Sequence, residues 1–443
     1  MKLRLFTLIL LAGLTFTTLF SQNINKPKLD SLFNVLAENN KAMGSVAVSK
    51  NGTVLYSRAI GYISISQTDK KVATIATKYR IGSITKMFTA SMIFQLIEEG
   101  KINLTTTLDT YFPDIPNASK ITISNLLNHR SGIHNFTDDP EYLTYMTQPK
   151  TEDEMVKIIS KNKVDFEPDA KASYSNSNFV LLGYIIEKIT KQPYASNLEK
   201  RICSKIGLKD TYVGKKTNLI NNEAYSYKFE GEWKQLPETD MSIPGGAGSI
   251  ISTPSDLTRF VEGLFSLKLV GQTSLNKMKM MTDGIGMGMF QFPFYGKVAY
   301  GHNGEIDGFV CNVAYFPEDS LALSYCTNGM DFSLNDILIG VLSISFNKQY
   351  SIPDFKTITL KTEDLDRYLG VYSSTQVPIK ITVTKNNTIL TAQGEGQPPF
   401  NLEATDKDKF KFDPAGVIME FNPAKNEMTL KQGGGSFLFT REK

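Results

Sequence analysis

The chain has 443 residues, of which 41% are hydrophobic and 21% are charged. This is the composition of a globular protein, long enough for two or three domains and for a core that needs no disulfide or metal support. The formal net charge of +3 argues against a nucleic-acid-binding protein or a polybasic membrane patch, and the three cysteines lack the spacing of a zinc or CxxC redox site.

The first 21 residues have the pattern of a secretory signal peptide. Lys2 and Arg4 form a short basic region, and an apolar run follows from residue 5 to residue 20. Ser21 supplies the small residue before a cleavage site. An uncleaved membrane anchor is the alternative, but the apolar run is short for a membrane span. We therefore expect an exported protein, periplasmic or secreted, with no membrane span after cleavage.

The first predicted elements of the mature chain are a helix and a hairpin. Residues 27–43 have the apolar periodicity of an amphipathic helix. The β-branched runs 45–49 and 53–57 flank Asn51-Gly52, a two-residue turn that favours a hairpin.

A central helix is predicted from Ser83 to Glu99, ending at Gly100, because glycine is favoured just after a helix. Its apolar residues surround the whole helix, which is typical of a buried one. Residues 104–190 are mostly helix and loop. A later helix begins near Pro254, with Asp256 as a charge in its first turn rather than a catalytic acid.

The second half of the domain predicts three strands and a closing helix. The strands are 298–303, 309–316 and 321–327, with turns at 304–308 and 317–320, and the helix is 337–346. With the early hairpin, these strands predict an antiparallel sheet flanked by helices, in an α/β domain that also has a mostly helical subdomain. Cys311 and Cys326 should lie opposite each other across two strands, so that a disulfide is one alternative and two buried thiols the other.

The composition changes after residue 350. We predict a domain over residues 22–350, a linker over 351–363 that includes Pro353, and an all-β domain over 364–443. Short strands with asparagine turns fill this last segment, which predicts a small barrel or sandwich.

Ser83-Ile84-Thr85-Lys86 is a Ser-x-x-Lys motif at the start of the central helix. Side chains three apart share one helix face, and the free N–H groups and dipole of a helix start favour negative charge at Ser83. A serine needs a neighbouring base to become a nucleophile. Desolvation lowers the pKa of a buried lysine, so that Lys86 is a candidate for this base. The motif alone is weak evidence, because the chain has three further matches. They begin at Ser160, Ser274 and Ser345.

Tyr174-Ser175-Asn176 is a second candidate for chemistry. A tyrosine beside a lysine can act as a general base, since the cation favours the phenolate, and Asn176 can hold a substrate amide. Taken alone, the tripeptide is more typical of a turn with a half-buried tyrosine.

His302-Asn303-Gly304 ends a predicted strand in a chain with only three histidines. Gly304 would let a ligand approach the strand edge closely, and the alternative is an exposed turn histidine. Of the other histidines, we expect His129 to be structural, bonding backbone in its loop, and His134 to be a loop residue without a partner.

Taken together and in this order, the three motifs resemble the serine β-lactamase and penicillin-binding protein superfamily, and best its class C and D,D-peptidase-like branch. The resemblance covers roughly residues 28–348, and the C-terminal segment resembles the lipocalin-like domain often appended to such hydrolases. Further stretches that resemble the family are 80–83, 127–132, 245–248 and 308–309.

The resemblance implies the chemistry of the site. Ser83 would be the acylated nucleophile, and Lys86 and Tyr174 would share the acid–base work, with the acylation base left open between them. The backbone N–H groups of Ser83 and Glu305 would form the oxyanion hole. Neither a metal nor an organic cofactor is implied.

The resemblance also implies substrate-binding roles for Asn176, His302 and Gly304. Asn176 would bond the acyl side of the substrate, and His302 would line the opposite wall. True β-lactamases of this branch usually carry lysine where this chain has His302, and an unperturbed histidine is mostly neutral at pH 7. This departure favours a peptidase or esterase over an efficient β-lactamase.

The sequence therefore predicts an exported serine hydrolase that acts through an acyl-enzyme on amide or ester bonds, with D-amino-acid peptides as the leading substrate class. The alternatives are a β-lactamase and a non-catalytic penicillin- or peptidoglycan-binding protein. The expected partner is a small molecule or short peptide, with peptidoglycan-derived compounds and β-lactams as candidates, and no nucleic acid.

Overall fold

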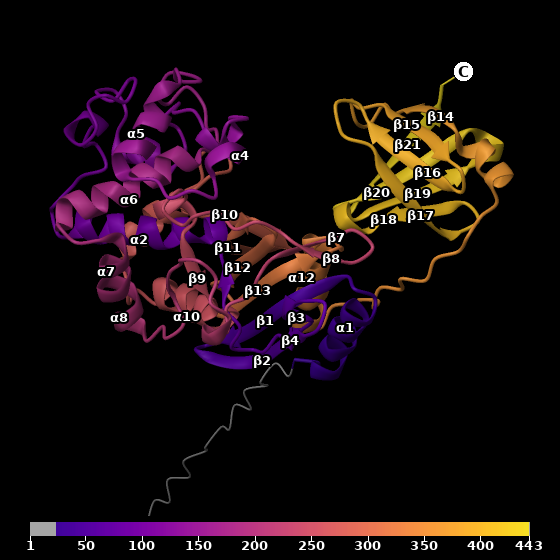
Figure 1. The fold of residues 1–443 in the computed structure, drawn as a ribbon, viewed down its shortest axis with the longest axis horizontal. Coiled ribbons are helices and arrows are strands. Elements are labelled where there is room, and N and C mark those ends of the chain that lie inside the picture. Colours follow the sequence, from indigo (N-terminus) through magenta and orange to yellow (C-terminus); the bar gives the residue numbers. More distant parts are fainter. Residues whose placement is uncertain (1–23, 443) are drawn as a thin grey trace, which may run out of the picture.

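The computed structural model describes residues 24–442, and the predicted signal peptide lies outside them. An antiparallel sheet packs between helices, a mostly helical region lies beside it, and a barrel ends the chain (Figure 1). The predicted fold class is confirmed. The helices are α1 Lys26–Glu38, α2 Thr85–Glu98, α3 Ile123–Leu127, α4 Tyr142–Tyr145, α5 Glu152–Lys161, α6 Asn176–Thr190, α7 Tyr194–Leu198, α8 Ser204–Ile206, α9 Gly245–Gly248, α10 Pro254–Phe265, α11 Gln272–Lys279 and α12 Leu334–Ser345.

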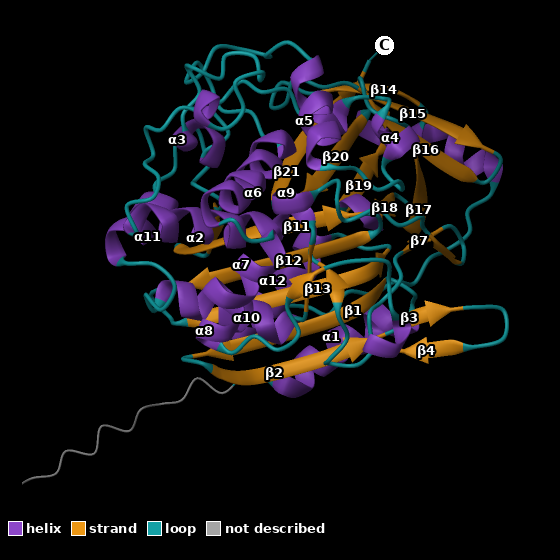
Figure 2. Ribbon diagram, turned by 60° about the vertical axis from the view of Figure 1, so that its left-hand side comes forward, coloured by secondary structure: helices purple, strands orange, loops and turns teal. Residues whose placement is uncertain are grey.

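The main sheet has the order β10-β11-β12-β13-β1-β2, and β7 and β8 extend it beside β13. Figure 2 shows β11, β12, β13, β1 and β2 side by side. Two smaller sheets, β3-β4 and β5-β9-β6, lie outside it. The strands up to the barrel are β1 Ala42–Lys50, β2 Thr53–Ile60, β3 Tyr62–Ile65, β4 Lys70–Val72, β5 Tyr79–Arg80, β6 Tyr212–Val213, β7 Tyr227–Phe229, β8 Trp233–Gln235, β9 Ile250–Ser252, β10 Phe290–Phe294, β11 Lys297–Ile306, β12 Phe309–Phe316 and β13 Leu321–Met330.

The sheet joins the two ends of the domain, because β1 pairs with β13 as well as with β2. The turn between β1 and β2 is Asn51-Gly52, and both residues have positive φ, 51° and 78°, as a tight hairpin requires. The first helix is shorter than predicted. It ends at Glu38, because Asn40 takes a left-handed conformation (φ 53°) and β1 begins at Ala42.

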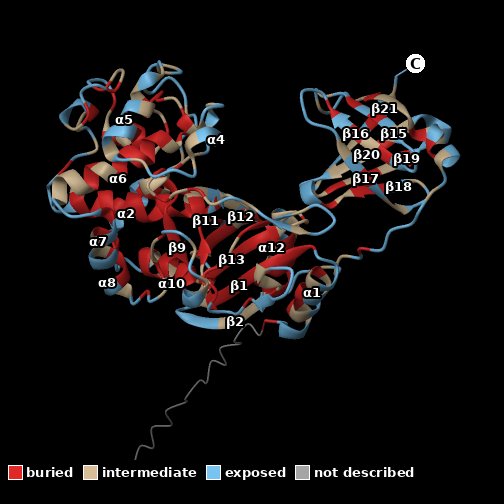
Figure 3. Ribbon diagram, viewed as in Figure 1, coloured by how far each residue is buried: buried red, intermediate tan, exposed pale blue. Residues whose placement is uncertain are grey.

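Both faces of the sheet are covered, so its central strands are almost wholly buried, whereas the edge strand β2 is mostly half-buried or exposed (Figure 3). Leu323 and Tyr325 of β13 pack with the cluster that contains α1 and α12. Ala322 and Cys326, on the other face, pack with α2, α6 and α10. This alternation follows from the period-two geometry of a strand.

The C-terminal segment forms a closed eight-stranded barrel, with its own apolar core. The sequence pattern predicted either a barrel or a sandwich, and the barrel is what forms. Closure pairs the first strand with the last and leaves no free edge. The strands are β14 Gly370–Ser373, β15 Ile381–Asn386, β16 Ile389–Gly394, β17 Phe400–Asp406, β18 Lys409–Phe412, β19 Val417–Asn422, β20 Glu427–Gln432 and β21 Gly435–Arg441.

Buried ion pairs connect the barrel to the N-terminal part of the chain. Nζ of Lys41, just before β1, lies 2.9 Å from Asp413 of the barrel and 3.0 Å from Asp331. Lys411 makes a second 2.9 Å pair with Asp413. The same junction contains Phe355, whose ring lies near both lysine ammonium groups.

Cys311 and Cys326 are directly opposite each other in the β12–β13 pairing, as the turn position predicted. Both are free and buried, and burial raises the pKa of the Cys311 thiol. The buried-thiol alternative is therefore the one that the structure contains. Among the described residues, no helix combines the length and the apolar character that crossing a bilayer requires.

Candidate active site

The candidate nucleophile lies at the start of the buried central helix. A short 3-10 turn, η1 Gly82–Ile84, holds Ser83 and leads directly into α2, whose first turn contains Lys86. Ser83 is half-buried, and Lys86 is completely buried. The helix is apolar on all sides and packed on all sides, so both side chains have fixed positions.

Lys86 is surrounded by oxygen atoms. Its Nζ lies 2.9 Å from Oγ of Ser83, 2.8 Å from Oδ1 of Asn176 and 2.9 Å from the carbonyl oxygen of Ala247. Burial lowers the pKa of Lys86 well below its ordinary value. As a neutral amine, Lys86 donates its two N–H bonds to the two carbonyl oxygens, which can only accept, and its lone pair is then left for the Ser83 hydroxyl.

Tyr174 completes a three-residue cluster. Its hydroxyl is hydrogen-bonded to Ser83, and Nζ of Lys86 lies 4.9 Å from the centre of its ring. Burial raises the pKa of Tyr174, so the phenol holds its proton in the free protein. The structure thus opposes the expectation that a lysine cation favours the phenolate, because desolvation acts against both charged forms here.

Asn176 is the first residue of α6, and both of its ends are held. Its backbone N–H donates to Oδ1 of Asn135 at 2.9 Å, and its Nδ2 donates to Oγ1 of Thr137 at 3.1 Å. With Oδ1 bonded to Lys86, the side chain is oriented and lines the pocket in front of Ser83.

The opposite side of Ser83 is the free edge of β11. Pairing with β10 stops at Gly301, so beyond it this edge of β11 lies against η1, while the other edge stays paired with β12. Gly82 has φ +50°, and a Cβ there would lie 2.7 Å from the backbone nitrogen of Glu305. Ser83 and Glu305 consequently line the same pocket, as two converging backbone donors require.

Two expectations about this strand were wrong. Residues 304–308 were expected to be a turn, but β11 continues to Ile306. Gly304 was expected to admit a ligand, but the position of its absent Cβ lies 1.9 Å from the carbonyl oxygen of Ile81. The close approach that Gly304 permits is that of the chain's own segment before Ser83.

His302 lies behind the cluster of Ser83, Lys86 and Tyr174 instead of forming the wall of the pocket. It is 3% exposed, and its ring centre is 6.3 Å from that of Tyr174 and 4.9 Å from that of Phe290. Burial, together with the nearby Lys86, lowers the pKa of His302 to about 3. Its Nδ1 bonds the carbonyl oxygen of Asn303, so a neutral ring with the proton on Nδ1 faces the tyrosine.

His129 supports the tyrosine segment, so the structural role expected for it holds. Its Nδ1 accepts the backbone N–H of Ser175 at 3.0 Å, and its carbonyl accepts that of Ser173 at 2.9 Å. Its ring stacks on Tyr174 with 4.4 Å between centres. The backbone that it bonds is therefore that of residues 173–175 and not only of its own loop.

His134 has partners that the sequence did not indicate. Its ring nitrogens lie 2.9 Å from Asp165 and 3.2 Å from Asp139. Burial lowers the pKa of His134, but the hydrogen bonds and charges of the two carboxylates outweigh it, and the net shift is upward.

Asp256 lies in the first turn of α10, as expected, and its carboxylate accepts hydrogen bonds from the Asp210 N–H and the Thr211 hydroxyl.

The serines of the other three Ser-x-x-Lys motifs have surroundings that differ from those of Ser83. None of them lines the pocket at the start of α2. Ser160 bonds a carbonyl of its own helix, and Ser274 bonds Glu98. Burial of the lysine and an opening at the serine occur together only at Ser83 and Lys86.

The pocket in front of Ser83 has a volume of about 390 Å³. Most of its wall is apolar, and these residues were not predicted from the sequence, because they come from separate segments that share no local pattern. They are Phe136, Tyr142, Leu143, Met146, Ile243, Pro244, Ala247 and Ile306. Ala247 could have been found through the glycine-rich stretch 245–248, which the resemblance already included.

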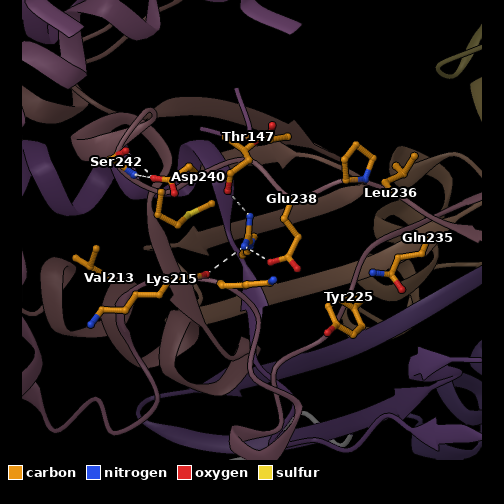
Figure 4. Close-up of a pocket in the computed structure, with 15 residues that line it drawn as sticks. Thr147, Val213, Lys215, Tyr225, Gln235, Leu236, Glu238, Asp240 and Ser242 are labelled. Carbon is orange, nitrogen blue, oxygen red and sulfur yellow. Dashed lines mark hydrogen bonds and ion pairs between the residues drawn. The ribbon is translucent and has the colours of Figure 1, made fainter. Parts of the chain in front are cut away.

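A second pocket, of about 770 Å³, shares the lining residue Thr239 with the first. Figure 4 shows residues that line this second pocket. Its lining combines apolar side chains with charged ones and comes mainly from residues 213–216 and 235–242. Within residues 24–442, no group of three or more His, Cys, Asp or Glu side chains is arranged to hold a metal ion.

The chain was compared with known proteins. The family model described as Beta-lactamase matches residues 30–339. Penicillin-binding protein 4* of Bacillus subtilis is 26% identical over 434 residues, covering 90% of this chain and 94% of that protein. Teichoic acid D-alanine hydrolase of Staphylococcus aureus is 28% identical, covering 66% of this chain and 72% of that one.

Among solved structures, the D-amino acid amidase of Ochrobactrum anthropi SV3, in complex with D-phenylalanine, superposes with a TM-score of 0.63. It is 27% identical, and the match covers 72% of this chain and 99% of that one.

Proposed function

This chain belongs to the β-lactamase family, and on that premise we propose that it hydrolyses amide or ester bonds of D-amino-acid derivatives through an acyl intermediate on Ser83. Its relatives support hydrolytic enzyme activity. The single observation that carries the proposal is the convergence of the Lys86 amine and the Tyr174 phenol on the Ser83 hydroxyl, which lines the pocket.

In the proposed reaction, Lys86 is the acylation base, because its lowered pKa leaves a lone pair beside the Ser83 hydroxyl. Oγ attacks the substrate carbonyl and passes its proton to Nζ. The oxyanion that forms is bound by the backbone N–H groups of Ser83 and Glu305.

Collapse of this intermediate breaks the bond to the leaving nitrogen or oxygen. Lys86 and Tyr174 deliver the proton taken from Ser83 to that atom, which Tyr174 can do because it holds its proton. A water molecule, deprotonated by the same pair, then attacks the ester and regenerates Ser83. No step requires a metal or cofactor.

The apolar wall of the pocket supports a substrate with an aliphatic or aromatic side chain next to the scissile bond. Leu143 and Met146 extend the wall outward from Phe136 at its base. The amidase relative that holds D-phenylalanine supports the same substrate class.

The β-lactamase alternative receives less support from the site. A β-lactam carries a carboxylate that a cation would bind, and the residue at the corresponding place, His302, is buried and neutral. A non-catalytic binding role does not require a buried, neutral lysine beside Ser83, so it does not account for Lys86.

We also propose that residues 1–21 direct export, and that residues 22–350 form the hydrolase domain, 351–363 a linker and 364–443 a lipocalin-like domain.

The test compares D- and L-phenylalanine amide, a D-alanyl ester and nitrocefin as substrates of the wild type and of Ser83→Ala. We expect hydrolysis of the D-amide, slow or absent nitrocefin turnover, and a loss of about a thousandfold or more in kcat/KM for Ser83→Ala. Intact-mass spectrometry should find the acyl adduct on the peptide that contains Ser83.

Ser160→Ala is the matched control, since it removes the serine of another Ser-x-x-Lys motif on an exposed helix, and it should keep full activity. Equal rates for wild type and Ser83→Ala would overturn the proposal, and rapid nitrocefin turnover would favour the β-lactamase alternative.

A further inference from the structure

The larger pocket beside the candidate active site continues from it. Thr239 lines both pockets, and its N–H and hydroxyl both bond Asp307, which lines the smaller one. Arg80, three residues before Ser83, lines the larger pocket and pairs with Asp307 at 3.0 Å. Thr239 and Arg80 are therefore linked through Asp307 by hydrogen bonds and an ion pair, and Arg80 belongs to the segment that leads to Ser83.

The segment that contains Lys215 and Lys216 is held in place at the rim of the larger pocket. Nη2 of Arg80 donates to the carbonyl of Lys215 at 3.1 Å and to Glu238 at 2.6 Å. The backbone N–H of Thr217 donates to the same carboxylate at 2.9 Å. Figure 4 shows Lys215 and Glu238 around this pocket. The backbone of this segment is thus fixed before a ligand binds, so binding requires no rearrangement of it.

Among residues 24–442, the charges of this pocket that have no ion-pair partner are two lysines and one carboxylate, that of Asp240. Glu238 is occupied by Arg80 and by Thr217 N–H, and Asp240 accepts two hydrogen bonds from Ser242, at 3.0 and 2.6 Å. Lys215 and Lys216 are both exposed, and neither ammonium group has a partner among residues 24–442. The two ammonium groups outweigh the one carboxylate, so the pocket favours a ligand that carries negative charge.

We propose that the pocket at Lys215 and Lys216 is a second subsite, which binds an anionic group, carboxylate or phosphate, on the acyl part of the substrate. This inference rests on the proposed function, since Asn176 places the acyl side of the substrate in the smaller pocket. An anion several bonds from the scissile carbonyl enters the larger pocket past Thr239. The natural substrate is then a longer, charged D-amino-acid derivative and not a free amino-acid amide.

The test uses three substrates with one scissile bond and different tails: acetyl-, succinyl- and phosphonoacetyl-glycyl-D-phenylalanine amide. We expect the wild type to prefer the two anionic tails, and the double variant Lys215→Gln/Lys216→Gln to lose about fivefold in kcat/KM on them and nothing on the acetyl form. The better of the two anionic tails distinguishes carboxylate from phosphate.

The matched control is Lys200→Gln/Lys205→Gln, which removes two exposed, unpaired lysines outside the pocket and should leave the preference unchanged. Equal wild-type rates on all tails, or an equal loss on all tails in the Lys215/Lys216 variant, would overturn the subsite.

A binding measurement separates failure of the subsite from failure of the proposed function. Titration calorimetry with the Ser83→Ala protein and the succinyl and acetyl peptides needs no turnover. Tighter binding of the succinyl peptide that disappears in Lys215→Gln/Lys216→Gln supports the subsite even if no substrate is hydrolysed, and equal affinities would refute it.

Discussion

At the scale of single residues, the chemistry depends on the protonation states of Lys86 and Tyr174. A lysine with three oxygen neighbours could be an ammonium, but complete burial opposes the charge, and the pKa of Lys86 is lowered for that reason. Burial also keeps the proton on Tyr174. The two groups therefore start as a neutral base and a neutral acid, which is the pair that acyl transfer needs.

Replacement of Lys86 by methionine should remove the base without opening a cavity. We expect kcat/KM for a D-amino-acid amide to fall by about a thousandfold while the melting temperature stays the same or rises, because a buried amine is lost. The wild type should be active well below the ordinary pKa of lysine, since the neutral form is reached at lower pH. A kcat/KM that keeps rising up to about pH 10 would contradict the lowered pKa.

At the scale of secondary structure, the site depends on how closely β11 approaches η1. Gly304 permits this contact, because a Cβ would overlap the carbonyl oxygen of Ile81. The same approach brings the backbone of Glu305 beside Gly82 and so beside Ser83. The proposed oxyanion hole thus depends on two glycines on facing elements.

Gly304→Ala should force η1 away from β11. We expect a loss of about 1–3 kcal/mol in the free energy of unfolding, together with a fall in kcat greater than the rise in KM. Urea unfolding and steady-state kinetics measure the two effects. Gly271→Ala is the control, because its Cβ would meet only the carboxylate of Glu98, at 3.3 Å and away from the pocket, so it should cost less stability and leave kcat and KM unchanged.

The stability of the loop between α3 and η3, which contains His134, should depend on pH. Its raised pKa means that the protonated ring, held by Asp165 and Asp139, stabilises the fold at low pH, and that this contribution is lost as pH rises through the folded-state pKa. We expect His134→Gln to lower the melting temperature at about pH 5.5 and to have little effect at about pH 8.5. A deficit that is equal at both pH values would show that the charge of His134 is not involved.

At the scale of the whole molecule, the barrel is attached through a small group of buried charges. Lys41 is 9% exposed at its side chain and Asp413 is 7% exposed. Burial lowers the pKa of Lys41, but the hydrogen bonds and charges of Asp413 and Asp331 outweigh this and raise it. These groups stabilise the contact only as a complete set, since an unpaired buried charge is costly.

Asp413→Ala should therefore leave Lys41 and Lys411 poorly compensated. We expect the free energy of unfolding to fall by about 3–5 kcal/mol, or the barrel to melt in a separate, earlier transition. Calorimetry of the full chain measures both outcomes. Asp364→Ala removes an exposed carboxylate from the C-terminal segment, and its melting curve should equal that of the wild type. If both variants melt alike, the ion pairs do not hold the barrel in place.

Local patterns in the sequence were enough to predict the elements of the fold and the main candidates for the site. Strand alternation and the Asn51-Gly52 turn placed the sheet, and the spacing of Ser83 and Lys86 put two reactive groups on one helix face. These signals depend only on neighbours within a few residues, so they can be read without the fold.

Tertiary structure alone decided which groups meet and in which protonation state. Ala247 reaches Lys86 from 161 residues away, Ile81 occupies the space beside Gly304, and His302 is buried behind Tyr174 and not at the pocket wall. Burial and hydrogen bonding from distant segments determine these features. They arise from packing between elements, which no local periodicity encodes.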